Sequence, residues 1–327
     1  MMLSRVADDL FWTARYLERG ADIVRLLEIS YLLDLDRPEK AAPQWEPLVW
    51  ITGDMALFRE RYGKATRENV IRFLVLDTDY ANSVIACLTK ARINAKGLRE
   101  QIPAVLWEEI NTLWQVADHL GKSPKLSYPR ILSGCRDIGR RQALIMGLLT
   151  ETMPRGEGYH LWQLATYLER ADKTSRMLHV KYFHLLPTLA HVGTIIDDAQ
   201  WSALLQSMGV REDYHRQYGL IAPDKVIGMI VCDPNFARSI LFCLKEALAN
   251  LLAMPDESRG NASDRLTALC ARISKLSGAQ IIDIGVHEFI NALQIDLNHV
   301  TDALMESIFP PILPEKYAVP TAQESSQ

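Results

Sequence analysis

The chain of 327 residues has few of the features that mark secreted, membrane-spanning or disulfide-bonded proteins. Its five cysteines are odd in number, far apart and set among apolar residues, which is typical of reduced thiols rather than of a disulfide framework or a zinc site. No apolar run approaches the roughly 18 residues that a membrane-spanning helix needs. The amino terminus carries Asp8 and Asp9 and has no apolar core, unlike a signal peptide. These absences predict a cytoplasmic protein.

Motifs for metal, phosphate and nucleophile chemistry are also missing. No two of the eight histidines are four residues apart, the spacing of a helical metal-ligand pair. No glycine-rich loop follows a strand pattern, and there is no Gly-x-Ser-x-Gly sequence. A net charge of −4 provides no general attraction to nucleic acid or to an anionic membrane. We therefore expect no metal, no cofactor, no nucleic-acid partner and no membrane association.

Helical spacing, by contrast, runs through nearly every apolar segment. Leu10, Ala14, Leu17, Ala21 and Val24 recur at intervals of four and three residues, which places them on one stripe of a long helix. Strand patterns of period two are missing, so the sequence predicts an all-α protein. Capping residues, glycines and prolines predict helices with both ends defined over 4–33, 43–53, 55–62, 77–102, 130–150 and 158–187. Further helices are predicted to begin at Thr66, Asp233 and Ser263, and others to end at residue 120, before Gly209, before Gly219 and at residue 309.

A tetrapeptide, Tyr-Leu-Glu-Arg, occurs at residues 16–19 and again, 151 positions later, at residues 167–170. A second series of matches has an offset of 156: Gln-Trp at 44–45 and 200–201, Gly53 with Gly209, and Tyr-Gly at 62–63 and 218–219. We interpret the two offsets as an internal duplication with a five-residue insertion. It predicts two pseudo-symmetric halves of about six to seven helices, 1–151 and 152–314, packed as one unit, and a disordered tail, 315–327.

The repeated Glu-Arg pair requires partners outside its own helix. Neighbouring residues on a helix point about 100° apart, so Glu18 cannot pair with Arg19. An unpaired buried charge costs several kcal/mol. If the two halves face each other, the simplest arrangement is crossed, with Glu18 bound to Arg170 and Glu169 bound to Arg19.

The Glu-Arg set has two interpretations. It is either a buried ionic network that locks helix packing or the lining of a groove between the halves that binds a ligand through its carboxylates and guanidiniums. The helix face of Glu18 continues with Asp22 and Arg25, and the matching face of the second half continues with Lys173 and Arg176. The candidate groove residues are therefore Glu18, Arg19, Arg25, Glu169, Arg170 and Arg176.

Two other segments are candidate sites. Asp77 and Asp233 are expected to be helix N-caps, with Ser83 and Ser239 inside the following helices. The alternative is an anion site at a helix N-terminus, aided by Arg238 in the second half.

The irregular segment 152–158 leads into the second Glu-Arg helix and contains Arg155 and Glu157. It is either a connector between the halves or part of a site at the mouth of the groove.

Taken together, the motifs at 2–8, 14–19, 152–158, 168–171 and 233–239 resemble those of the alpha-E proteins, a bacterial family named for its helices and its Glu-Arg motif. Gly20 departs from the alanine that is usual there, and Ala237 from the usual proline. The resemblance covers most of residues 2–310. It implies as partners a circularly permuted ATP-grasp protein and a transglutaminase-like protein, because family members occur beside or fused to such proteins.

The resemblance leaves more than one class of function open. In the first, the chain is a non-catalytic helical partner of an ATP-grasp-type amide ligase and binds a peptide or amino acid in the Glu/Arg groove. In the second, it is an enzyme of peptide or amide metabolism that uses Glu18 or Glu169 as general base. In the third, the Glu-Arg pairs are only a structural network. The lack of a nucleophile–base set favours the first class over the second.

Overall fold

The computed structural model describes residues 2–35, 45–122, 127–184 and 195–308. These ranges contain fifteen α-helices and no β-strand, so the predicted all-α class is confirmed. The predicted tail, 315–327, lies outside the described residues, and the division of the chain at residue 151 stays a prediction. No helix in the described ranges has both the length and the apolar content needed to cross a membrane.

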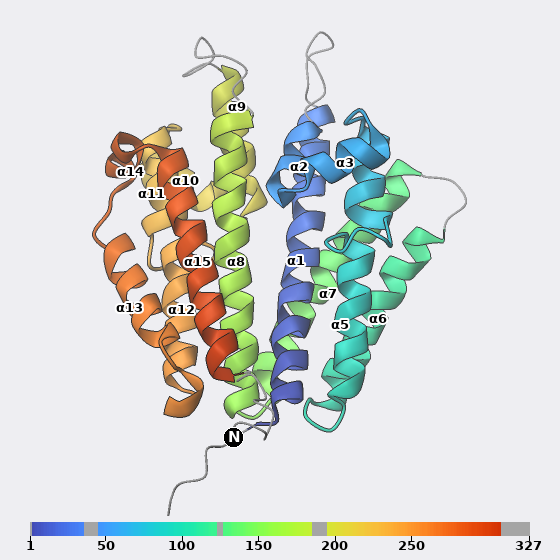
Figure 1. Cartoon of the computed structure of the whole chain (residues 1–327). Coiled ribbons are helices and arrows are strands. Elements are labelled where there is room, and N and C mark those ends of the chain that lie inside the picture. Colours follow the sequence, from blue (N-terminus) through green and yellow to red (C-terminus); the bar gives the residue numbers. More distant parts are fainter. Residues whose placement is uncertain (1, 36–44, 123–126, 185–194, 309–327) are drawn as a thin grey trace, which may run out of the picture.

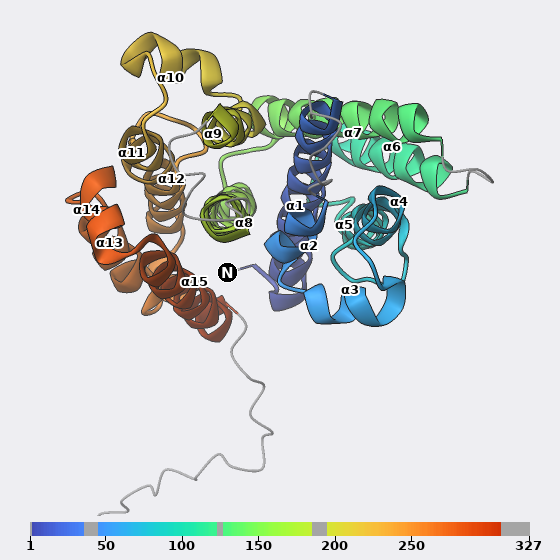
Figure 2. The same ribbon diagram turned by 90° about the horizontal axis from the view of Figure 1, so that it is seen from above.

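Two long helices, α1 (Ser4–Leu35) and α8 (Glu157–His184), lie side by side along the middle of the molecule (Figures 1 and 2). The remaining long helices flank this central pair. On the α1 side these are α5 (Val84–Gly97), α6 (Ala104–Gly121) and α7 (Tyr128–Thr152); on the α8 side they are α12 (Ile240–Leu252), α13 (Ala262–Ile273) and α15 (Val286–Ile308).

Shorter elements connect the long helices. They are α2 (Glu46–Thr52), α3 (Met55–Tyr62), α4 (Arg67–Ile71), the π-helical η1 (Arg72–Leu76), α9 (Ile195–Ser207), α10 (Arg211–Tyr218), α11 (Pro223–Cys232), the 3₁₀ turn η3 (Asp256–Ser258) and α14 (Gly278–Ile284). Two of them cross between the sides, because α2 packs against α8 and α9 packs against α1. The central pair is therefore held from both directions.

The core follows from the apolar stripes of the two central helices. All five residues of the stripe predicted on α1, from Leu10 to Val24, are buried, as are Leu161, Ala165 and Leu168 on α8. Burying apolar surface contributes roughly 25 cal/mol per Å², so this interface is a main source of stability. Trp45 and Trp201, matched at the offset of 156, are both buried in the same core.

Most helix boundaries lie within a few residues of those predicted. Helix α3 matches residue for residue, and Thr66 caps α4 by accepting the backbone N–H of Asn69 at 3.2 Å. No separate helices are predicted from the sequence for the segments that form α11 and α14. The last helix, α15, begins after Gly285, whose φ of +99° ends α14, a left-handed conformation that favours glycine.

The predicted N-caps Asp77 and Asp233 are wrong. Each is followed by a turn, and the helix begins only after the serine six residues later. The cap of α5 is Ser83, whose hydroxyl accepts the N–H of Ala86 at 3.1 Å. The cap of α12 is Ser239, whose hydroxyl accepts the N–H of Phe242 at 3.0 Å. The aspartates instead accept two N–H groups of their own turns. An aspartate followed by exposed turn amides can satisfy that turn as well as a helix, and this is why sequence alone misplaced the cap.

The predicted cap Ser263 is also wrong. Helix α13 begins at Ala262, so Ser263 already lies inside the helix, and its hydroxyl donates to the carbonyl of Gly260 at 3.3 Å.

The two serines allow a matched test. We expect Ser239→Ala to lower the free energy of unfolding by about 1 kcal/mol, because it removes an N-cap. Ser263→Ala should change it by less than about 0.5 kcal/mol, because Ser263 is only partly buried and caps no helix. Urea denaturation followed by circular dichroism measures both values, and equal losses would contradict the cap assignment.

Candidate functional site

Two buried glutamates face each other across the α1–α8 interface. Glu18 on α1 is 1% exposed and Glu169 on α8 is 0% exposed. Arg170 holds Glu18 through two bonds, Nε–Oε1 at 2.7 Å and Nη2–Oε2 at 3.2 Å. Arg19 holds Glu169 in the same way, Nε–Oε1 at 2.7 Å and Nη2–Oε2 at 3.1 Å. The predicted crossed pairing is confirmed, with each helix supplying the acid for one pair and the guanidinium for the other.

Both carboxylates are held ionised. Burial alone raises the pKa of Glu18, but the positive charges of Arg170 and Arg238 outweigh it and lower the pKa to about 2. Burial is likewise outweighed at Glu169 by Lys173 and Arg15, which hold its pKa well below the usual range. A general base works best with a pKa near the ambient pH and needs a free oxygen. Neither glutamate meets these conditions, so the geometry speaks against the base role considered for them.

Two further arginines and an aspartate surround Glu18. Arg238 places Nη1 3.1 Å from Asp22 Oδ1 and 3.5 Å from Glu18 Oε1, and Arg25 pairs with the same Asp22 oxygen. Burial and the neighbouring Glu18 raise the pKa of Asp22. Arg238 therefore does not serve the anion site considered at the α12 N-terminus, because its guanidinium turns into the Glu18 cluster.

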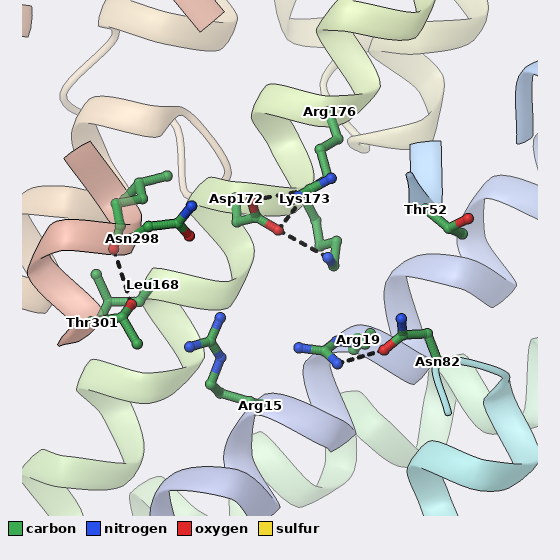
Figure 3. Close-up of a pocket in the computed structure, with 11 residues that line it drawn as sticks. Arg15, Arg19, Thr52, Asn82, Leu168, Asp172, Lys173, Arg176, Asn298 and Thr301 are labelled. Atoms are coloured by element: carbon green, nitrogen blue, oxygen red, sulfur yellow. Dashed lines mark hydrogen bonds and ion pairs between the residues drawn. The ribbon is translucent and has the colours of Figure 1, made fainter. Parts of the chain in front are cut away.

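The residues around Glu169 leave a cavity of about 190 Å³. Arg15 adds a third contact to Glu169, Nε–Oε2 at 2.7 Å, and Lys173 lies 3.4 Å from Oε1. Arg176 binds Asp172 at 3.0 Å. The cavity is lined by residues of α1, α2, the turn before α5, α8 and α15, namely Arg15, Arg19, Thr52, Asn82, Leu168, Asp172, Lys173, Arg176, Leu297, Asn298 and Thr301 (Figure 3).

This cavity is suited to an anion. Four cations line it, Arg15, Arg19, Lys173 and Arg176, whereas the acids that contact them are Asp172 on the wall and Glu169 behind it. Lys173 and Arg176 outweigh burial and lower the pKa of Asp172, so both acids are charged. The net charge is +2, and charge-assisted hydrogen bonds to an anion are about twice as strong as neutral ones. The guanidiniums of Arg15 and Arg19 project from α1 toward the α8 residues in Figure 3.

Of the predicted groove residues, Arg19 and Arg176 line the cavity, and Glu18, Arg25 and Arg170 belong to the ion-pair cluster around Glu18. Sequence reasoning missed Arg15, Asn82 and Asn298 as cavity residues. Arg15 precedes Arg19 by one helical turn, a spacing that could have revealed it. Nothing in the sequence links Asn298 of α15 to α1.

Arg155 and Glu157 do not lie at the mouth of this cavity. Arg155 donates to the carbonyl of Thr150 at 2.9 Å, and Glu157 accepts the backbone N–H of Met2 at 3.0 Å. Glu157 precedes Asp172 by fifteen residues of helix, or about 22 Å at 1.5 Å per residue. The segment acts as a connector that fastens the start of the chain to the start of α8.

Ser83 and Ser239 are fully buried, and their hydroxyls also donate to the carbonyls of Asp77 and Asp233. With the serines occupied in this way, the two segments hold caps and turns rather than an open anion site. In the part of the chain that the structure describes, no group of three or more His, Cys, Asp or Glu residues is placed to hold a metal ion.

Comparisons with known proteins give a family without an assigned chemistry. The model of the Alpha-E family, "a predicted alpha-helical domain with a conserved ER motif", matches residues 2–309. Uncharacterized proteins of Mycobacterium bovis and of Mycobacterium tuberculosis are each 22% identical to the chain over 280 residues. The match covers 80% of this chain but only 31% of each relative. No solved structure matches the chain.

The buried pairs predict a large asymmetry between two Glu→Gln changes. Glu169→Gln should lower the free energy of unfolding by about 3 kcal/mol or more, because it removes the charge that compensates three buried cations. Glu68→Gln, at an exposed pair with Arg72, should cost less than about 1 kcal/mol. Chemical denaturation at neutral pH measures both. Similar values for the two variants would show that the crossed pairs do not hold the interface.

Proposed function

The chain belongs to the Alpha-E family, and we propose that it is a non-catalytic helical binding module whose cavity between α1 and α8 holds the carboxylate of a peptide or amino acid. The cavity of about 190 Å³ with four lining cations carries this proposal. A purely structural ion network needs no cavity, and it gains nothing from cations in excess of its acids. The network around Glu169 has both a cavity and more cations than acids.

We propose further that the module serves an ATP-grasp-type amide ligase, with a transglutaminase-like protein as a second partner. The resemblance in motifs and the family membership support this context, and a carboxylate is the group that amide-bond formation consumes. The chain covers less than a third of the length of its mycobacterial relatives. The partner role is therefore proposed for the assembly of this chain with the ligase, and not for this chain alone.

The duplication is part of the same proposal. Matched local geometry supports it: Ser83 and Ser239 make the same two hydrogen bonds, and Cys87 and Cys243 each donate to the carbonyl six residues before them. In a duplicated chain the two Glu-Arg clusters descend from one site. The cavity borders the Glu169 cluster, and Arg238 joins the Glu18 cluster.

The matched arginines test the binding site. We expect the chain to bind acetate and short free-acid peptides, and Arg176→Ala to weaken this binding about tenfold or more because it removes a charge-assisted contact. Arg25→Ala, at the matching position of the Glu18 cluster, should leave binding unchanged because Arg25 does not line the cavity. Isothermal titration calorimetry at low salt measures the affinities. Binding that survives Arg176→Ala, or that Arg25→Ala weakens equally, contradicts this location.

The partner proposal has its own test. We expect a circularly permuted ATP-grasp protein from the same organism to co-purify with the chain and to form amide product faster in its presence. Arg176→Ala should reduce that gain while leaving co-purification intact. If ligase turnover is the same with wild-type chain, with Arg176→Ala and with no added chain, the accessory role is wrong.

A further inference from the structure

Both acids around the cavity are already paired with cations. Glu169 accepts Arg19 and Lys173 on one oxygen and Arg15 and Arg19 on the other. Asp172 accepts Arg176 on both oxygens and Lys173 on one. An ammonium group that entered the cavity would therefore meet a net positive charge and no carboxylate that lacks a cationic partner.

Asp54 is the next acid in this region, and it lies behind Asn82. Its Oδ2 accepts the hydroxyl of Tyr80 at 2.6 Å and the amide of Asn82 at 3.3 Å, while Asn82 in turn accepts Arg19 at 2.7 Å. Asp54 does not line the cavity. Even when Asp54 is counted with Glu169 and Asp172, the four lining cations leave an excess of positive charge.

One wall of the cavity is neutral and has hydrogen-bonding capacity to spare. Asn298 is exposed, and its side chain makes no hydrogen bond to any residue in the described ranges. Thr301 donates its hydroxyl to the carbonyl of Leu297 at 2.9 Å, which leaves its oxygen free to accept. Figure 3 shows both residues on α15, across the cavity from Arg19. An asparagine amide can donate to a carbonyl and accept from an N–H, the two groups of a peptide bond.

The size of the cavity limits how much of a ligand can enter. A volume of about 190 Å³ is below the ~300–1,000 Å³ typical of sites that enclose a whole small molecule. A single small residue fits, and a longer ligand must extend out of the cavity.

From these observations we infer that the cavity recognises the C-terminal residue of a peptide and discriminates against a free amino acid. This inference rests on the proposed function and specifies its ligand. The terminal carboxylate lies against Arg15, Arg19 and Arg176, and the preceding peptide bond lies against Asn298 and Thr301. In a peptide the nitrogen of the terminal residue is a neutral amide, whereas in a free amino acid it is an ammonium group that the cationic lining repels.

Four small ligands separate the alternatives when titrated calorimetrically into the full chain at pH 7 and low salt. We expect N-acetylalanine to bind at least tenfold more tightly than alanine, since only alanine carries an ammonium group. N-acetylalanine amide should bind too weakly to detect, because it has no carboxylate. Inorganic phosphate should bind more weakly than N-acetylalanine, because it has no peptide bond to offer Asn298.

A variant on the neutral wall tests the second contact. Asn298→Ala should weaken the binding of N-acetylalanine about threefold to tenfold and leave the binding of acetate unchanged, because acetate does not reach α15. As an exposed residue, Asn298 can be changed without unfolding the chain, and thermal denaturation checks this directly.

The outcomes distinguish this inference from the function on which it rests. If no carboxylate binds, both the proposed binding function and the C-terminal specificity are wrong. If acetate binds in an Arg176-dependent way but alanine binds as tightly as N-acetylalanine, the proposed binding function stands and the C-terminal specificity is wrong. Phosphate that binds more tightly than N-acetylalanine would also overturn the specificity and would indicate a site for a phosphoryl group.

Discussion

The structure depends on two carboxylates buried between two helices. Glu18 and Glu169 are almost completely removed from solvent, and an ion in such a place costs several kcal/mol unless it is paired and hydrogen-bonded. Neither glutamate can pair with the arginine that follows it, because adjacent residues on one helix point in different directions, so each bidentate arginine comes from the opposite helix. The side-by-side packing of α1 and α8 therefore has a specific register, in which Arg19 meets Glu169 and Arg170 meets Glu18. The flanking helices are arranged around a pair whose alignment is set by charge as well as by apolar packing.

The two sides of this pair differ through a few positions. Where the Glu18 side has Arg238, the matching position on the Glu169 side is Asn82, whose shorter side chain leaves space. Asp22 corresponds to Lys173, so one side gains an acid where the other gains a cation. If the halves are duplicated as proposed, these few exchanges place an acid and Arg238 beside one crossed pair and a cationic cavity beside the other, and both crossed pairs are kept.

The glutamates themselves are poor candidates for chemistry. Their oxygens are taken up by guanidiniums, and their pKa values are held low by the same contacts that keep the helices in register. The groups that can meet a ligand are the surplus cations around them. In the proposed binding site the Glu-Arg motif is thus the support, and Arg15, Arg176 and Asn298, which lie outside the tetrapeptide, form the recognising surface.

Several features could be determined from the sequence alone. The helical class and the stripe from Leu10 to Val24 follow from spacing, a local rule that one helix obeys by itself. The crossed pairing of Glu18 and Glu169 follows from the repeated motif and from the cost of unpaired charge. The caps of α5 and α12 escaped prediction because an aspartate and a serine six residues apart can each satisfy backbone amides, and only the folded turn selects between them. The tertiary structure alone decided which side of the central pair is hollow and that Asn298 borders it. Those facts depend on how α15 and the turn before α5 pack against α1 and α8, and contacts between residues so far apart in the chain leave no periodic signal in the sequence.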